Sequence, residues 1–117
     1  MPKLRIVNSF RYALRGLGHV FTYELSFRLQ LLASAAVVFL MLWFPLVLWQ
    51  RVMLLVLIVS VLVLEVINTV FERLIDAFKP RLHPVVAEIK DMMAAAVLLA
   101  SVVAAVIGLL IFWPYLF

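Results

Sequence analysis

Three long stretches of this chain lack charged side chains, and they constrain its fold more than any other feature. The first, residues 29–50, is 22 residues long without a charge, and residues 92–117 carry none either. The second is apolar from Val52 to Leu64 and continues with helical periodicity to about Phe78. A hydrocarbon core of about 30 Å is crossed by roughly 20 helical residues. The sequence therefore predicts three transmembrane helices, at residues 29–49, 52–78 and 92–114.

The composition supports this interpretation. Of the 117 residues, 68% are hydrophobic and 14% are charged, whereas soluble domains are about 45–50% apolar. The length predicts one domain, residues 1–117. The chain has no cysteine, which excludes disulfides and thiolate zinc sites. A pI near 10 is compatible with nucleic acid, but in so apolar a chain we expect contact with anionic membrane lipids and no nucleic-acid partner.

The basic residues predict how the chain is oriented. Five of the ten lysines and arginines precede the first span and four lie between the second and third, whereas Arg51 is alone on the opposite side. By the positive-inside rule, the amino terminus and the connection at residues 73–91 are cytoplasmic and the carboxyl terminus is outside. The sequence thus predicts a multi-pass protein of the cell membrane.

A separate amphipathic helix is predicted at residues 4–24. Apolar side chains such as Phe10 share one face, and basic ones such as Arg11 share the other. This pattern suits a helix that lies in the membrane interface rather than crossing it. Two glycines, Gly16 and Gly18, are expected to break or bend it.

The third predicted span has a small residue at every fourth position. These residues are Ala96, Ala100, Ala104 and Gly108. Such a pattern allows helices to approach closely in lipid. Three helices offer little interior in which to hide polar groups, so the sequence predicts a homo-oligomer.

Polar residues follow one stripe of the second span. Glu65, Asn68 and Glu72 are spaced i, i+3 and i+7, which places the two carboxylates about 20° apart around the axis and about 10 Å apart along it. An ionisable group at the centre of a bilayer costs at least about 2.5–3.5 kcal/mol, so such residues usually line a polar site. This stripe therefore predicts chemistry, or ion movement, at a membrane face.

Four more polar residues are expected at a similar depth: Glu24 and Arg28 at the first span, and Lys90 and Asp91 before the third. Carboxylate and amide oxygens are hard ligands, which suits magnesium bridged to phosphates. The two cations could neutralise phosphate charge. The deepest carboxylate, Glu65, is placed as a general base should be.

Simpler interpretations are open for the same residues. Glu24 and Arg28 are spaced as an i, i+4 ion pair, and Glu65 with Asn68 could form interhelical hydrogen bonds. Asp76 continues the stripe in the head-group zone, where a solvated cap is expected. The alternative function is a non-enzymatic oligomeric membrane protein, such as a proton or cation pathway lined by Glu65.

Two motifs carry a resemblance to a known family. They read Glu65-Val-Ile-Asn68-Thr-Val-Phe-Glu72-Arg-Leu-Ile-Asp76 and, after a short loop, Lys90-Asp91-Met-Met-Ala-Ala-Ala-Val-Leu-Leu. They resemble the signature of the small prokaryotic membrane lipid kinases, which comprise diacylglycerol kinase and undecaprenol kinase. The resemblance covers nearly the whole chain.

The resemblance implies an all-α trimer of three-span protomers with amphipathic surface helices, in the prokaryotic inner membrane. Each would transfer the γ-phosphate of ATP to a lipid alcohol. It implies that Glu65 is the catalytic base, that Glu24 and Glu72 hold Mg²⁺, and that Glu65 and Arg28 meet the lipid substrate. The ATP-binding residues it implies are Arg5, Tyr12, Glu24, Asn68, Glu72, Lys90 and Asp91.

Four details depart from the family pattern or distinguish its branches. Gln30 stands where some diacylglycerol kinases have an acidic residue, and Val70 stands where the family usually has a small one. The His83-Pro84 pair and the ending Gly108-Leu-Leu-Ile-Phe-Trp-Pro114 are more similar to undecaprenol kinases. Gln30, the His83-Pro84 pair and this ending favour a polyprenol acceptor, whereas Val70 is expected to alter packing beside the site.

Overall fold

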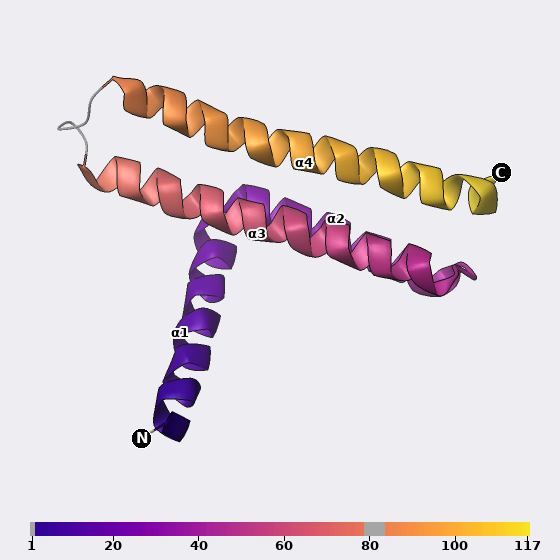
Figure 1. Cartoon of the computed structure of the whole chain (residues 1–117), viewed down its shortest axis with the longest axis horizontal. Helices are drawn as coiled ribbons and strands as arrows, with labels where there is room; N and C mark the ends of the chain where they lie inside the picture. Colours follow the sequence, from indigo (N-terminus) through magenta and orange to yellow (C-terminus); the bar gives the residue numbers. More distant parts are fainter. Residues whose placement is uncertain (1, 79–83) are drawn as a thin grey trace.

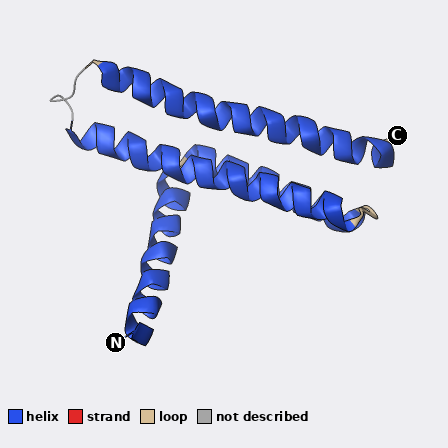
Figure 2. Cartoon of the chain, in the orientation of Figure 1, coloured by secondary structure: helices blue, strands red, loops and turns tan. Residues whose placement is uncertain are grey.

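The computed structural model describes residues 2–78 and 84–117, and in these ranges the protein forms four helices and no strand (Figures 1 and 2). The helices are α1 (Pro2–Tyr23), α2 (Leu25–Trp43), α3 (Leu48–Phe78) and α4 (Val85–Leu116). The last three are long and apolar enough to cross a membrane. The predicted all-helical membrane fold is confirmed.

Helix α2 ends at a proline. Steric contact with Pro45 disfavours helical geometry for the preceding residue, and Phe44 is extended, with φ −87° and ψ 150°. Helix α2 therefore ends at Trp43 rather than at the predicted residue 49. Helix α3 begins at Leu48, earlier than the predicted residue 52, and the Gln50 Oε1 atom accepts a hydrogen bond from the backbone N–H of Val47 at 3.1 Å.

Helix α1 is continuous, so the predicted break at Gly16 and Gly18 is wrong. A glycine inside a helix costs only about 1 kcal/mol relative to alanine, which the rest of this 22-residue helix can tolerate. Only Val20 of α1 is buried. Figure 1 shows α1 leaving the bundle at a steep angle, so most of this amphipathic helix is exposed.

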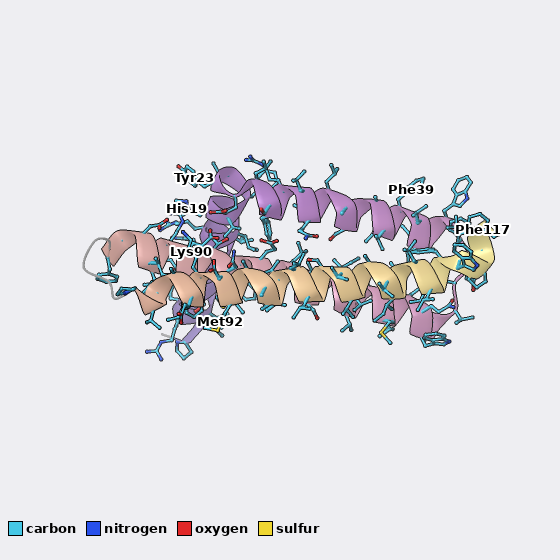
Figure 3. All side chains as sticks on the ribbon, turned by 90° about the horizontal axis from the view of Figure 1, so that it is seen from above. His19, Tyr23, Phe39, Lys90, Met92 and Phe117 are labelled. Carbon is cyan, nitrogen blue, oxygen red and sulfur yellow. The ribbon has the colours of Figure 1, made fainter. Side chains whose placement is uncertain are left out.

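Helices α2, α3 and α4 run side by side in alternating directions, and α3 packs against both of the others (Figures 1 and 3). Their lengths differ. The 19 residues of α2 extend roughly 28 Å, whereas the 31 residues of α3 extend roughly 46 Å, at 1.5 Å per residue. Helix α4 has 32 residues. Both α3 and α4 are thus longer than a hydrocarbon core of about 30 Å.

The hydrophobic core lies where α2 turns into α3 and α4 ends. Its buried residues are Met41, Leu46, Leu54, Ile111 and Phe112. The ring of Phe44 lies 6.0 Å from that of Phe112 and 6.1 Å from that of Tyr115, between centroids. The Tyr115 hydroxyl donates to Gln50 Oε1 at 3.1 Å. We call this region, defined by Phe44, Gln50, Phe112 and Tyr115, the aromatic end.

A cavity of about 350 Å³ lies between α2, α3 and α4. Its lining is apolar except for Gln30, Ser34 and Ser101, and Gln30 Nε2 donates to Ser101 Oγ at 3.1 Å. Ala104 and Gly108 also line it, and a side chain added at Gly108 would meet nothing within 4 Å. The small residues of α4 therefore face open space here, and at Gly108 they do not produce a close helix contact within the chain.

Candidate active site

The lengths of the helices place the polar residues at a similar depth in the membrane. Counted from Leu48, roughly 20 residues of α3 cross the hydrocarbon, so Glu65 lies near its margin and Glu72 lies beyond it. Glu24 immediately precedes α2, which is just long enough to span. Figure 3 shows Tyr23, the neighbour of Glu24, and Lys90 at the same end of the bundle, opposite Phe117. We call this region the polar end; its residues are Glu24, Glu65, Asn68, Glu72, Asp76 and Lys90.

Glu65 is the most enclosed carboxylate of the polar end. Only 6% of its surface is exposed. Glu72 and Glu24 lie close enough for their negative charges to act on it. Thr69, which is 4% exposed, donates its hydroxyl to the backbone oxygen of Glu65 at 3.0 Å. Of the carboxylates that the sequence grouped, Glu72 and Glu24 are thus the ones whose charges act on Glu65.

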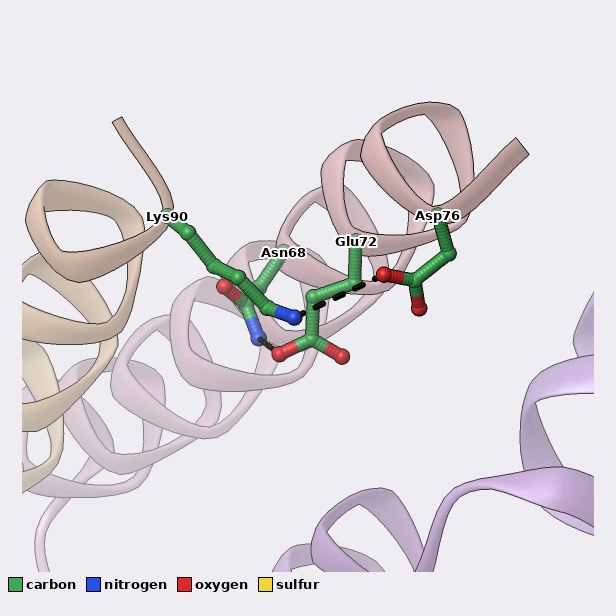
Figure 4. A network of polar contacts seen from close by, with 4 residues as sticks. All are labelled: Asn68, Glu72, Asp76 and Lys90. Carbon is green, nitrogen blue, oxygen red and sulfur yellow. Dashed lines mark hydrogen bonds and ion pairs between the residues drawn. The ribbon is translucent and has the colours of Figure 1, made fainter. Parts of the chain in front are cut away.

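Asn68 links this group to the next turn of α3. Its Nδ2 atom donates to Glu72 Oε1 at 3.2 Å, as Figure 4 shows. Its Oδ1 atom is buried and finds no hydrogen-bond partner among the described residues. A buried acceptor without a partner is costly in a folded protein. The amide therefore orients one carboxylate and offers an oxygen for a ligand.

Lys90 of α4 reaches across to α3. Its Nζ atom lies 3.7 Å from Asp76 Oδ1 (Figure 4), and the two side chains are 38% and 58% exposed. An ion pair this exposed contributes about 0–1 kcal/mol, so Lys90 can turn to another anion at little cost. The sequence interpretation treated Asp76 as a solvated cap and did not pair it with Lys90. The spacing of Asp76, four residues after Glu72, was the signal that it continues the site.

Arg28 is directed toward α1. Its Nη1 atom donates to the backbone oxygens of Phe21 at 3.2 Å and Thr22 at 2.9 Å. These carbonyls belong to the last turn of α1, where a helix has no backbone partners for them and favours a cation. Arg28 thus holds the carboxyl end of α1, whereas its predicted contact with the lipid substrate stays a prediction.

Comparison with known proteins identifies the family of this chain. Residues 11–112 match the family model described as prokaryotic diacylglycerol kinase. The chain belongs to this family. It is 32% identical over 112 residues to the undecaprenol kinase of Bacillus subtilis (strain 168), which covers 96% of this chain and 91% of that protein. It is 28% identical over 111 residues to the diacylglycerol kinase of Escherichia coli (strain K12), which covers 95% of this chain and 91% of that protein.

Family membership confirms the enzyme class predicted from the motifs, a membrane lipid kinase. It also argues against the alternative of a non-enzymatic proton or cation pathway, because the family is one of enzymes. A kinase of this family uses ATP as its co-substrate. The polar stripe of α3 is therefore interpreted below as a site for phosphoryl transfer.

Two predicted nucleotide-binding residues lie away from the polar end. Arg5 and Tyr12 are exposed on α1, and α1 points away from the bundle (Figure 1). At 1.5 Å per residue, Tyr12 lies roughly 18 Å along the helix from Glu24 and Arg5 roughly 28 Å. The kinase does not bring these two residues to the carboxylates of the same chain, and their contact with adenine stays a prediction.

The donor atoms of the polar end fit Mg²⁺ without enclosing it. Within residues 2–78 and 84–117, no three Asp, Glu, His or Cys side chains come together as a metal-binding cluster. Mg²⁺ is commonly held by one or two carboxylates together with water and substrate phosphates. Glu72, which accepts a hydrogen bond from Asn68 at 3.2 Å, and the unpartnered Oδ1 atom of Asn68 are oxygen donors of that kind, and Glu24 is the second carboxylate that the resemblance implies. Such a set would hold the ion together with the phosphates of a bound nucleotide.

Proposed function

We propose that this protein transfers the γ-phosphate of ATP, with Mg²⁺, to a lipid alcohol at the cytoplasmic face of the inner membrane. The supporting observation is the position of Glu65. This buried carboxylate lies at the margin of the hydrocarbon, beside Glu72 and Glu24, in a chain of a lipid kinase family. A lipid hydroxyl and a water-soluble nucleotide can meet only near this boundary between the hydrocarbon and the aqueous phase.

The residues of the polar end have distinct roles in this proposal. Glu65 accepts the proton of the lipid hydroxyl. Glu24 and Glu72 would hold Mg²⁺, which would neutralise charge on the nucleotide phosphates. Asn68 fixes Glu72 through its 3.2 Å hydrogen bond, and Lys90 leaves Asp76 to meet a phosphate. Phosphoryl transfer depends mainly on such positioning and charge neutralisation.

The apolar cavity is where the lipid tail would lie. Val61 lines the cavity and precedes Glu65 by one turn of α3, so the lining of the cavity reaches to within one helical turn of the proposed base. Its volume of about 350 Å³ suits part of a hydrocarbon chain. An acceptor whose only polar group is its hydroxyl matches a lining that is apolar beyond Gln30, Ser34 and Ser101. We therefore propose a polyprenol, undecaprenol, in preference to diacylglycerol; His83 of the supporting His83-Pro84 motif lies outside the described residues.

We also propose that the kinase is a homotrimer, with its amino terminus and residues 73–91 in the cytoplasm. Exposed apolar side chains cover the outward faces of α3 and α4, where another protomer can pack. In such a trimer Arg5, Tyr12 and Asp91 would contribute to the nucleotide site of a neighbouring protomer. Asp91 is exposed. Residues 79–83 of the cytoplasmic connection lie outside the described part of the chain.

The direct test is a side-by-side acceptor assay. Purified protein reconstituted in phospholipid vesicles is given labelled ATP with undecaprenol or with diacylglycerol, with Mg²⁺ present or chelated. We expect phosphate to enter undecaprenol faster than diacylglycerol, and only when Mg²⁺ is present. Labelling of neither lipid would contradict the proposed function, and faster labelling of diacylglycerol would contradict the acceptor preference.

A further inference from the structure

One contact at the polar end belongs to none of the roles above. The guanidinium carbon of Arg73, on α3, lies 5.4 Å from the ring centroid of Tyr23, the last residue of α1. This is the geometry of a cation–π contact. Arg73 follows Glu72 in the sequence and Tyr23 precedes Glu24. The contact therefore joins the immediate chain neighbours of the two proposed magnesium ligands.

Glu24 lies at the point where the chain changes direction. It is the single non-helical residue between α1 and α2, with φ −113° and ψ 107°. Its backbone N–H still bonds to the oxygen of Val20 at 2.9 Å, and its own oxygen accepts from the N–H of Arg28 at 3.2 Å. A change in the angle between α1 and α2 requires a change in the backbone dihedral angles of Glu24. The carboxylate of Glu24 would move with that change.

Side-chain packing alone holds α1 only weakly at its angle to α2. Of the residues of α1 only Val20 is buried, and α1 packs mainly against α2. Two cations supply the specific contacts at its end. Arg28 binds the terminal carbonyls of Phe21 and Thr22, and Arg73 binds the ring of Tyr23 from the helix that carries Glu72.

We propose that the Arg73–Tyr23 contact is a positioning contact that sets the separation of the Glu24 and Glu72 carboxylates, and so the affinity for magnesium-nucleotide. In this proposal Arg73 and Tyr23 act through their chain neighbours, Glu72 and Glu24, rather than through contacts of their own with nucleotide or lipid. The inference rests on the proposed roles of Glu24 and Glu72.

The test compares four junction variants with a matched control. Arg73→Ala and Tyr23→Leu remove the contact, whereas Tyr23→Phe keeps the aromatic face and Arg73→Lys keeps a cation. The control is Arg15→Ala, because Arg15 makes a similar contact with Tyr12 at 5.7 Å, but within α1. The reconstituted enzymes are assayed at varied Mg²⁺ concentration with saturating lipid.

We expect Arg73→Ala and Tyr23→Leu each to raise the Mg²⁺ concentration for half-maximal rate about three- to fivefold, as loss of an exposed cation–π contact allows, with kcat nearly unchanged. Tyr23→Phe, Arg73→Lys and Arg15→Ala should stay within about twofold of the wild type. Unchanged Mg²⁺ dependence in Arg73→Ala, or an equal defect in Tyr23→Phe and Tyr23→Leu, would overturn the proposal.

A second measurement does not depend on activity. The chain has no cysteine, so spin labels can be placed at Asn8→Cys on α1 and Ser60→Cys on α3, both exposed positions, in protein diluted with unlabelled chains. Pulsed electron paramagnetic resonance should give a broader distance distribution after Arg73→Ala than after Arg15→Ala. Equal widths would refute the positioning contact, whereas an inactive wild type with a tight distribution would refute only the proposed function.

Discussion

At the aromatic end, the ring of Phe44, which follows α2, packs against the rings of Phe112 and Tyr115 on α4, and the buried residues of the core are apolar. At the polar end, the buried residues of α3 include Glu65 and Thr69, and Asn68 keeps a buried oxygen without a partner among the described residues. Each end has one buried side-chain atom without a hydrogen-bond partner among the described residues, since Arg51 Nε next to Gln50 is the other, but the buried carboxylate lies at the polar end alone among these residues. Apolar packing at the aromatic end therefore holds the helices together, while the polar end keeps the carboxylates that the proposed reaction needs.

The largest expected effect is at Glu65. Replacing Glu65 by Gln keeps its size but removes the proposed base, and general base catalysis is worth about 10²–10⁴-fold. We expect turnover of the lipid alcohol to fall by about 10³-fold while equilibrium binding of magnesium-ATP is largely kept. Lipid phosphate formed from labelled ATP measures the first and a nucleotide-binding titration the second. Phosphate incorporation at the wild-type rate would remove Glu65 from this role.

A core variant tests the other region. Phe112 is 6% exposed and packs against Phe44, so Phe112→Ala should cost about 3 kcal/mol of stability by leaving a cavity. Unfolding in mixed micelles with increasing dodecyl sulfate measures this loss. The fraction that remains folded should keep the wild-type KM for magnesium-ATP. A raised KM with unchanged stability would show that the two ends are not divided as described.

A smaller effect is expected at the proposed magnesium ligands, Glu24 and Glu72. Glu72→Gln removes one negative charge but keeps an acceptor for Asn68, and loss of a charged contact is worth about 1.5–3 kcal/mol. The KM for magnesium-ATP should rise by about 10- to 100-fold, with the same direction for Glu24→Gln. Rate measurements over a range of magnesium-ATP concentrations decide this. If both variants instead matched Glu65→Gln in binding and rate, the assigned division of roles would fail.

The smallest effect is expected from Tyr115→Phe. This change removes the hydroxyl that donates to Gln50 at 3.1 Å and keeps the ring against Phe44. Interhelical hydrogen bonds in membrane proteins average about 0.6 kcal/mol, so a loss of that order is expected in the same micelle assay. Activity should not change. A loss comparable to that of Phe112→Ala would assign the aromatic end's stability to polar contacts.

Features that depend on one helix were predictable from the sequence. The charge-free stretches located the three apolar helices, and the i, i+3, i+7 spacing placed Glu65, Asn68 and Glu72 on one stripe, because helical periodicity is fixed. The continuity of α1 through Gly16 and Gly18 was missed, since a glycine weakens a helix without ending it.

Features that depend on two helices were harder to predict. The pairing of Lys90 with Asp76, and of Arg73 with Tyr23, requires the relative rotation and axial offset of separate helices, which side-chain packing determines. The spacing of Arg28 from Glu24 suggested an ion pair. The structure directs Arg28 to the end of α1 instead, because the terminal carbonyls there lie within its reach.

The short α2 and the long α3 make the enzyme sensitive to the thickness of its membrane. Helix α2, with its 19 residues, has no spare length, so a thicker bilayer must either thin around the protein or rise along α3 toward Glu72. Such mismatch costs fractions of a kcal/mol per ångström. Acyl-chain length in the host membrane thereby adjusts how far the proposed base stands from the aqueous phase, with no change in the protein itself.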